Sequence, residues 1–316
     1  MIRFIIRRAI FLFATVFVVS VLAFVIPYLS EADPARMILR ARMGGDLALD
    51  PATVEALRRQ YGLDQPIPVQ YFRWAEAAIT GDFGQSFTNR QPVGGIVIRA
   101  LGVSFLLALA ALVLATVIAV PLGILAALRP GGRRDGLILT LTQGLVALPE
   151  YWLAPLGMLV FALWLGWLPA AGWTSPMSVI LPASVLSLRP LAYLLGVTRA
   201  SMITVLEAPY ITAARSRGLS QLLTLRRHAL KNAMVPVMTL FSIWLAGTLG
   251  GSVVIEVIFN IPGLGRVMYD AVVNADMPVL QAGVIATVGL AIVINTLTDI
   301  GYAVLNPAIL VGESRG

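Results

Sequence analysis

Long apolar runs separated by shorter polar segments dominate the chain. Six of these runs hold roughly 20 residues or more, and a helix of that length crosses a hydrocarbon core of about 30 Å. The runs cover residues 9–29, 101–128, 137–167, 179–197, 234–258 and 278–305. The pattern therefore predicts an all-α integral membrane protein with six transmembrane helices.

The third run is interrupted near its middle by Pro149 and Glu150. It could form one kinked helix or two short helices. Two crossings need about 20 residues each, and residues 137–167 are too few for that. We therefore expect one span with a kink at the proline.

The first run follows three arginines, so a secretory signal peptide is the competing interpretation. The apolar core of a signal peptide has about 7–15 residues, and residues 9–29 exceed that length. No convincing A-x-A cleavage site follows. We therefore expect a retained first helix that begins in the cytoplasm.

Residues 30–100 contain charges, prolines and glycines but no spanning run. Asp50 and Pro51 can cap and start a helix that Gly62 stops. A second short helix is expected to end at Gly81. The apolar faces of these helices would hold Val54, Leu57 and Tyr61 in the first and Val69, Phe72 and Ile79 in the second.

The placement of arginines predicts the orientation. With six spans, the N-terminus, the 129–136 turn, the 199–231 loop and Arg315 share one side and hold 13 of the 23 cationic residues. The opposite short loops hold only Arg266. Cationic residues concentrate on the cytoplasmic side, so both termini are expected there. The predicted division is then 1–29 for the N-terminus and first helix, 30–100 for an extracytoplasmic segment, and 101–310 for a core of the five remaining spans with a cytoplasmic loop at 207–233.

Composition agrees with a membrane protein and excludes several kinds of site. Of the 316 residues, 58% are hydrophobic and 12% charged, against about 45–50% and about 25% in soluble chains. The net charge of +7 flanks apolar runs, so we expect contact with the bilayer and not with nucleic acid. The sequence has no cysteine and one histidine, which excludes thiolate metal sites and a multi-histidine cage within one copy.

The loop from Tyr210 to Pro236 carries five cationic residues and no acidic one. Pro209 ends the preceding span, residues 211–217 can form a short surface helix, and Gly218 suits the left-handed residue that ends it. Ser220 can cap a new helix that runs into the fifth span. The alternative is an ordinary basic loop whose arginines set the topology and contact lipid phosphates.

This loop resembles the EAA loop of bacterial ABC importer permeases, in their dipeptide/oligopeptide branch. That branch reads approximately Y-V-x-T-A-R-A-K-G-L and then R-H-A-L-x-N-A-x-x-P. The matching residues here are Tyr210, Ile211, Ala214, Arg215, Arg217, Gly218 and Leu219, then Arg227, His228, Ala229, Leu230, Asn232, Ala233 and Pro236. Thr212 stands in the position of the general motif's glutamate, and Lys231 in that of its later proline. The peptide branch commonly lacks both.

Further matches lie along nearly the whole chain, in the order found in the first permease subunit of peptide importers. They are GLDQP (62–66), GDFGQS (81–86), WLP (167–169), TRASM (198–202) and PGLG (262–265). The shared order and spacing are more specific than any one piece.

The resemblance implies a permease subunit of the bacterial inner membrane that imports di- or oligopeptides by alternating access. Its implied partners are a second permease, two cytoplasmic ATPases that bind ATP-Mg, and an extracytoplasmic substrate-binding protein. Nickel complexes, glutathione, opines and oligosaccharides are alternative substrates in the same family. The residues implied to couple to the ATPase are Tyr210, Ala213, Ala214, Arg215, Arg217, Gly218 and Leu219. The sequence lacks a G-x-x-x-x-G-K-[ST] phosphate loop, so we expect neither ATP hydrolysis nor a cofactor in this chain.

Two ionisable residues fall deep within predicted spans, Glu150 and Arg189. A charge at that depth is costly and usually faces a partner or a water-filled path. The two residues could line the translocation pathway as an ion pair and contact peptide termini. They could equally be a structural pair that locks the spans together.

Three carboxylates lie around the predicted outer end of the fifth span, Glu256, Asp270 and Asp276. They could contact the binding protein or the amino group of a substrate, but a solvated rim is the simpler interpretation. Gly247 and Gly251 form a G-x-x-x-G pair, which permits close helix approach. That approach could be to the second permease or to another helix of this chain.

A secondary transporter or channel that works without an ATPase is the main alternative function. We see no internal repeat of the kind common in such transporters, and carboxylates are scarce in the predicted spans. A membrane hydrolase would need a catalytic base, and the sole histidine, His228, belongs to the cytoplasmic loop.

Overall fold

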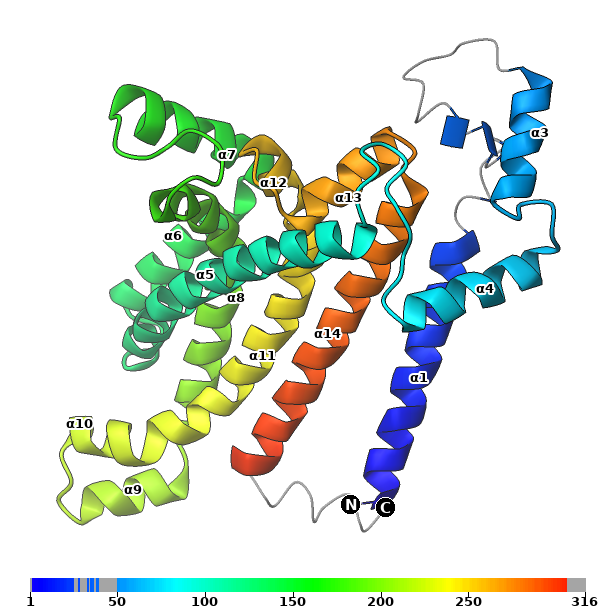
Figure 1. Cartoon of the computed structure of the whole chain (residues 1–316). Coiled ribbons are helices and arrows are strands. Elements are labelled where there is room, and N and C mark those ends of the chain that lie inside the picture. The colour runs from blue at the N-terminus through cyan, green and yellow to red at the C-terminus, as the bar shows by residue number, and fades with distance from the viewer. Residues whose placement is uncertain are drawn as a thin grey trace. The chain divides into compact units, whose positions relative to one another are not determined.

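The computed structural model of the protein describes residues 2–25, 28, 33, 35–36, 38–39 and 50–305 (Figure 1). These residues form helices and connecting loops. The one strand-like pairing among them is an isolated bridge between Gln85 and Pro92. Arg315, which contributes to the predicted orientation, lies outside the described residues. The described part of the chain is all-α, as the apolar pattern predicts.

The helices follow the predicted order with some differences in length. They are α1 (Ile2–Val25), α3 (Pro51–Gln60), α4 (Ile67–Ile79), α5 (Val93–Ala127), α6 (Arg133–Ala147), α7 (Glu150–Gly157), α8 (Ile180–Leu206), α9 (Pro209–Ser216), α10 (Gln221–Thr224), α11 (Leu230–Gly251), α12 (Val253–Ile258), α13 (Leu264–Val273) and α14 (Met277–Leu305). Two π-helical segments, Met158–Trp164 and Leu225–Ala229, continue α7 and α10, and a 3₁₀ turn, Pro176–Val179, precedes α8.

The chain divides into two compact units. Unit 1 contains residues 1–104 and 262–292, and unit 2 contains residues 105–261 and 293–316. Helices α5 and α14 each begin in unit 1 and end in unit 2. The predicted extracytoplasmic segment, residues 30–100 and named the outward segment after that prediction, therefore shares a unit with part of the predicted last span.

Four described helices are long and apolar enough to cross a membrane. They are Val93–Ala127, Pro176–Leu206, Leu222–Gly251 and Met277–Thr298. The bent pair α6–α7 brings the number to five if the pair forms one span, and the apolar part Leu12–Val25 of α1 is shorter. A membrane protein built of helices is confirmed, and the count of six spans stays a prediction.

The third apolar run is broken, not merely kinked. Helices α6 and α7 meet at 92°. Leu148 takes an extended conformation with ψ 126°, and Pro149 follows with ψ 141° as the N-cap of α7. A proline disfavours the helical conformation of the residue before it, so the helix ends at Ala147 instead of bending through.

The first short helix of the outward segment forms as predicted. The Asp50 side chain accepts a hydrogen bond from the Ala52 amide at 3.3 Å, and Val54 and Leu57 are buried. Gly62 adopts φ +65°. Arg58 donates a hydrogen bond to Asp33 at 2.6 Å, which raises the pKa of Arg58 and ties α3 to the segment before it.

Helix α4 forms as predicted, but its expected apolar face is not the buried one. Phe72 and Ile79 are 70% and 86% exposed. Tyr71 and Trp74 contact α1 instead, with ring centroids 5.5 Å from Phe24 in both cases. The reason is tertiary, because the aromatic side chains of α1 select which side of α4 packs against them.

The core of unit 2 surrounds α8. Leu194 and Leu195 are fully buried among Ala115 and Ala119 of α5 and Val237 of α11. A β-carbon on Gly123 would lie 2.8 Å from Cβ of Thr198, so α5 and α8 approach closely only because that residue is glycine. This packing fixes the end of α8 that leads into the basic loop.

Candidate functional site

The basic loop folds into an elbow that joins α8 to α11 through α9 and α10 (Figure 1). Pro209 begins α9 after Ala208, whose ψ is 143°. Gly218 ends it with φ +84°. The Ser220 hydroxyl accepts a hydrogen bond from the Leu223 amide at 3.4 Å at the start of α10. The local structure matches the sequence prediction at each of these turns.

One side of α9 is packed against both neighbouring helices. Ile211 and Ala214 have no exposed surface. They lie in one cluster with Met202 of α8, with Ala229 just before α11 and with Ala233 in α11. The side chain of Ala214, one of the predicted coupling residues, therefore faces inward. Its place in the structure is to hold α9 on the ends of α8 and α11.

The opposite side of α9 is open. Tyr210, Ala213, Arg215, Arg217 and Gly218 are exposed, and Leu219 is half-buried. The Tyr210 hydroxyl accepts a hydrogen bond from the side-chain amide of Asn232 at 3.2 Å, which links the start of α9 to α11.

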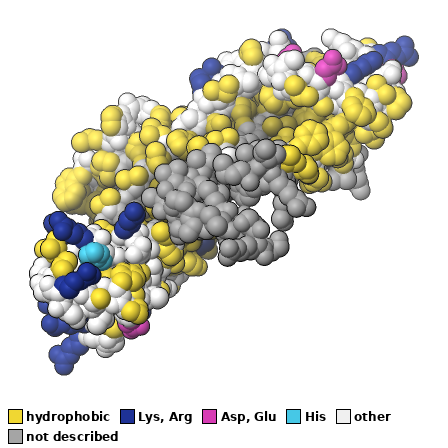
Figure 2. Space-filling view, turned by 90° about the horizontal axis from the view of Figure 1, so that it is seen from below, with side chains coloured by type: hydrophobic (Ala, Val, Ile, Leu, Met, Phe, Trp, Pro, Cys, Tyr) yellow, Lys and Arg dark blue, Asp and Glu magenta, His cyan; other side chains and the backbone are white. Residues whose placement is uncertain are grey.

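The cationic residues of the elbow have no ion-pair partner among the residues that the structure describes. They are Arg215, Arg217, Arg226, Arg227 and Lys231. Figure 2 shows cationic side chains gathered around the sole histidine on the face it draws. An exposed positive surface of this kind suits an acidic partner or lipid phosphates.

A π-helical turn, Leu225–Ala229, lies at the base of the elbow, where the sequence predicts a regular helix. π-turns are rare and frequently lie at functional sites. The Thr224 hydroxyl just before it is buried without a hydrogen-bond partner in the described structure. The spacing of apolar residues does not distinguish a π-helical turn from an α-helical one, so this turn was not predicted from the sequence.

A buried ion pair beside the elbow was also missed. Arg199 of α8 donates two hydrogen bonds to Asp135 of α6, from Nε and Nη2, each 2.6 Å long. Asp135 is 3% exposed and accepts a third hydrogen bond from the Gly131 amide at 2.8 Å. The sequence did hold a signal for this pair, because Asp135 is the one carboxylate in the 129–136 turn, which also carries three arginines. The pair clamps the start of α6 to the end of α8.

Glu150 and Arg189, predicted as a possible pair, lie together. Nε of Arg189 is 3.8 Å from Oε1 of Glu150. Both line a cavity of about 370 Å³ with Trp244, Gly247 and Gly251 of α11. Apart from the neighbouring backbone of α11 itself, no described atom would lie within 4 Å of a β-carbon on either glycine. Within the described chain, the G-x-x-x-G pair therefore borders this cavity instead of joining two helices.

The three carboxylates of the expected rim do not share one environment. Asp276 is buried and accepts hydrogen bonds from the Ser86 hydroxyl and from the amides of Phe87 and Thr88. Asp276 thus holds the 86–88 turn of unit 1, so a solvated rim is wrong for this residue.

Glu256 has no exposed surface and accepts a hydrogen bond from the Ser252 hydroxyl at 2.7 Å within unit 2. The solvated rim is wrong for this residue also. Only Asp270 is exposed, with its carboxylate 3.7 Å from Nε of Arg266 one helical turn earlier. The sequence pattern could not separate these three cases, because burial depends on which segments cover each residue.

Two family descriptions match this chain. Residues 1–110 match "Binding-prot-dependent transport system membrane comp, N-term", and residues 119–311 match "Binding-protein-dependent transport system inner membrane component". The second match includes the elbow and both residues of the Glu150–Arg189 pair.

Curated relatives match over nearly their full length. The glutathione transport system permease protein GsiC of Escherichia coli (strain K12) is 37% identical over 309 residues, which is 98% of this chain and 99% of that protein. Its counterpart in Shigella flexneri serotype 5b (strain 8401) is 36% identical over the same length. A solved structure described as an amino acid ABC transporter with histidines has a TM-score of 0.46 and 18% identity, over 65% of this chain and 92% of that one.

Proposed function

Because the chain belongs to the binding-protein-dependent transport permeases, the inner-membrane subunits of bacterial ABC importers, we propose that it carries short peptides into the cell. It is a multi-pass permease subunit and not a catalytic one. Membership in the family implies partner ATPases and a substrate-binding protein. The proposal concerns the substrate, the place of coupling and the composition of the complex.

The proposed substrates are di- and oligopeptides, and glutathione is the first to test. The motifs of the chain resemble those of peptide importers, and the relatives that match it over 98% of its length are named as glutathione permeases. Glutathione is itself a tripeptide, so both comparisons favour a short peptide. Nickel complexes, opines and oligosaccharides are the competing substrates.

The proposed coupling site is the exposed side of α9. One observation carries this proposal: α9 is anchored by Ile211 and Ala214 to the ends of α8 and α11 while its basic side stays open. A helix held in this way transmits a push from a docked protein to both long helices. We place the docking groove on a cytoplasmic ATPase, and the contacts on Tyr210, Ala213, Arg215, Arg217 and Gly218.

We further propose that the chain forms a heterodimer with a second, homologous permease and binds two ATPase subunits. The proposed function is tested by tagging this chain in its native cell and isolating the complex. We expect a second permease and ATPases to co-purify. Proteoliposomes of that complex, supplied with ATP and the binding protein, should accumulate labelled glutathione or a dipeptide. Uptake by this chain alone, driven by an ion gradient, would instead establish a secondary transporter.

Replacing Arg189 by leucine tests the proposed translocation pathway. We expect uptake of at least one class of peptide to fall about tenfold, because the variant loses one charge-assisted hydrogen bond between the guanidinium and a peptide terminus. ATP hydrolysis should persist, because the elbow is unchanged. Arg189→Lys keeps the charge beside Glu150 and serves as the control. Full uptake of every substrate by Arg189→Leu would end the pathway interpretation.

A further inference from the structure

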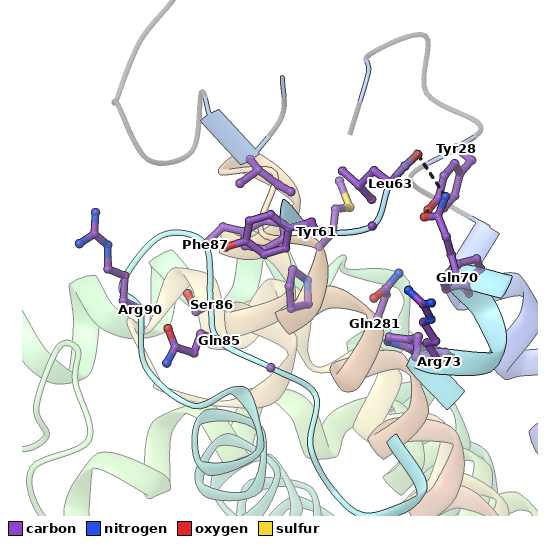
Figure 3. Close-up of a pocket in the computed structure, with 17 residues that line it drawn as sticks. Tyr28, Tyr61, Leu63, Gln70, Arg73, Gln85, Ser86, Phe87, Arg90 and Gln281 are labelled. Atoms are coloured by element: carbon purple, nitrogen blue, oxygen red, sulfur yellow. Dashed lines mark hydrogen bonds between the residues drawn. The ribbon is translucent and has the colours of Figure 1, made fainter. Parts of the chain in front are cut away.

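A cavity of about 550 Å³ lies within unit 1, lined mainly by residues of the outward segment (Figure 3). Its walls come from the end of α1, the turn between α3 and α4, α4 itself, the 84–90 loop and the first turns of α14. Ligand pockets usually enclose about 300–1,000 Å³. The cavity therefore has the size of a binding site, and no function proposed above uses it.

Much of the cavity wall is aromatic. The rings of Phe24 and Trp74 lie 5.5 Å apart, and those of Phe24 and Tyr28 lie 5.4 Å apart. Tyr61 and Phe87 form a further edge-to-face pair at 6.3 Å. All five residues line the cavity. Such a wall suits an apolar group of a ligand.

Gln70 lines the cavity, but its side-chain amide already makes hydrogen bonds within the protein. Its amide nitrogen donates to the carbonyl oxygens of Leu63 at 3.3 Å and Gln65 at 2.7 Å, and its amide oxygen accepts from the Tyr28 hydroxyl. Figure 3 draws the hydrogen bond from Gln70 to Leu63 as a dashed line beside Tyr28. Gln70 therefore holds the wall in shape and is not available to a ligand.

Arg73 and Gln281 remain available. Both side chains point into the cavity in Figure 3, one from α4 and the other from α14. Gln281 is 9% exposed, and its amide makes no hydrogen bond to another described residue. The Arg73 guanidinium has no carboxylate partner among the described residues. Gln281 thus has an amide, and the more exposed Arg73 a guanidinium, with hydrogen-bonding capacity left for a polar ligand.

The Arg73 side chain packs against the turn at Gly62. Gly62 has φ +65°, and a β-carbon there would lie 3.5 Å from Nη1 of Arg73. The guanidinium thus lies against the backbone of the turn. Arg90 also lines the cavity, and none of the described lining residues is acidic. The charge of the site suits an anion and offers nothing to an ammonium group.

We propose that this cavity binds a small carboxylate with an apolar body, such as the C-terminal residue of a short peptide. The carboxylate meets Arg73 and Gln281, and the apolar group meets the aromatic wall. A guanidinium pairs with a carboxylate through two parallel hydrogen bonds. A peptide N-terminus is disfavoured by the same positive charge. The choice of a peptide rests on the proposed function, whereas the site itself does not.

The test uses the full chain in lipid nanodiscs and two probes of the same shape, N-acetyl-L-phenylalanine and its C-terminal amide. Binding is measured by calorimetry. We expect the acid to bind saturably and the amide at least about tenfold more weakly, because the amide loses the charge-assisted hydrogen bonds. Equal binding of acid and amide, or no binding of the acid, would overturn the proposal.

Variants locate the site. Arg73→Gln should weaken binding of the acid about tenfold or more and leave the weak binding of the amide unchanged. Trp74→Leu should weaken both probes, because it removes part of the aromatic wall. Arg59→Gln, an exposed change on α3 outside the cavity, is the matched control and should change nothing. An equal effect of Arg59→Gln and Arg73→Gln would show that anions are attracted by the general positive charge, and it would refute binding of the carboxylate at Arg73.

The assay contains no ATPase and no binding protein, so its outcome is separate from that of uptake. Binding of the acid by a complex that fails to import peptides would leave the site standing and refute the proposed substrate. The reverse result would refute the site alone. If the acid does not bind but Arg73→Gln weakens association of the substrate-binding protein, the cavity belongs to a protein contact and our proposal is wrong.

Discussion

Replacing Gly218 by valine is expected to uncouple ATP hydrolysis from uptake while insertion and abundance stay near normal. Gly218 has φ +84°, and no described atom lies within 4 Å of an added β-carbon. The cost is therefore backbone strain, about 1–3 kcal/mol for a residue that resists positive φ. Relief of that strain moves the end of α9. We expect peptide uptake per ATP hydrolysed to fall about tenfold in proteoliposomes.

Two controls separate coupling from strain. Gly218→Asn should retain most of the uptake, because asparagine tolerates the left-handed conformation. Gly81→Val places the same strain in the outward segment, where φ is +82° and the space is equally open. It should leave uptake per ATP unchanged. Normal coupling in Gly218→Val, or an equal loss in Gly81→Val, would count against docking at α9.

Replacing Arg199 by methionine is expected to destabilise the protein. The change leaves Asp135, which is 3% exposed, with only the Gly131 amide as a described hydrogen-bond donor. Loss of a hydrogen bond to a buried charged group costs about 1.5–3 kcal/mol. We expect a lower Tm in nanodiscs and a smaller amount of protein in the membrane.

A double-mutant cycle gives this prediction its control. Asp135→Asn combined with Arg199→Met should be more stable than Arg199→Met alone, because no unpaired carboxylate remains. Arg189→Met is the matched comparison. Its partner lies 3.8 Å away and its side chain is 52% exposed, so within the water-filled pathway proposed for the pair we expect a loss below about 1 kcal/mol. Equal losses in Arg189→Met and Arg199→Met would refute the clamp between α6 and α8.

Local signals in the sequence predicted the elbow well. Pro209, Gly218 and Ser220 act through their own backbone and side-chain conformations, and each stands where a helix begins or ends. The same holds for Asp50 at the start of α3. These features depend on neighbours along the chain, so one sequence suffices to find them.

Burial was harder to predict. Glu256 and Asp270 lie in similar sequence surroundings, yet one is fully buried and the other exposed. Phe72 and Ile79 have the period of a buried face, but Tyr71 and Trp74 pack on α1 instead. In a chain so rich in apolar residues, periodicity does not distinguish a face in contact with protein from one in contact with lipid.

The sequence by itself determined the class of the protein, the order of the helices and the basic loop with its turn residues. Apolar run length and backbone preference are local properties, and the family motifs are carried in the residues themselves. Only the tertiary structure decided that Ala214 faces inward, that α6 and α7 meet at 92° and that Arg199 closes on Asp135. It also brought Arg73 and Gln281 to one cavity. Residues so far apart in the chain meet only when their helices pack.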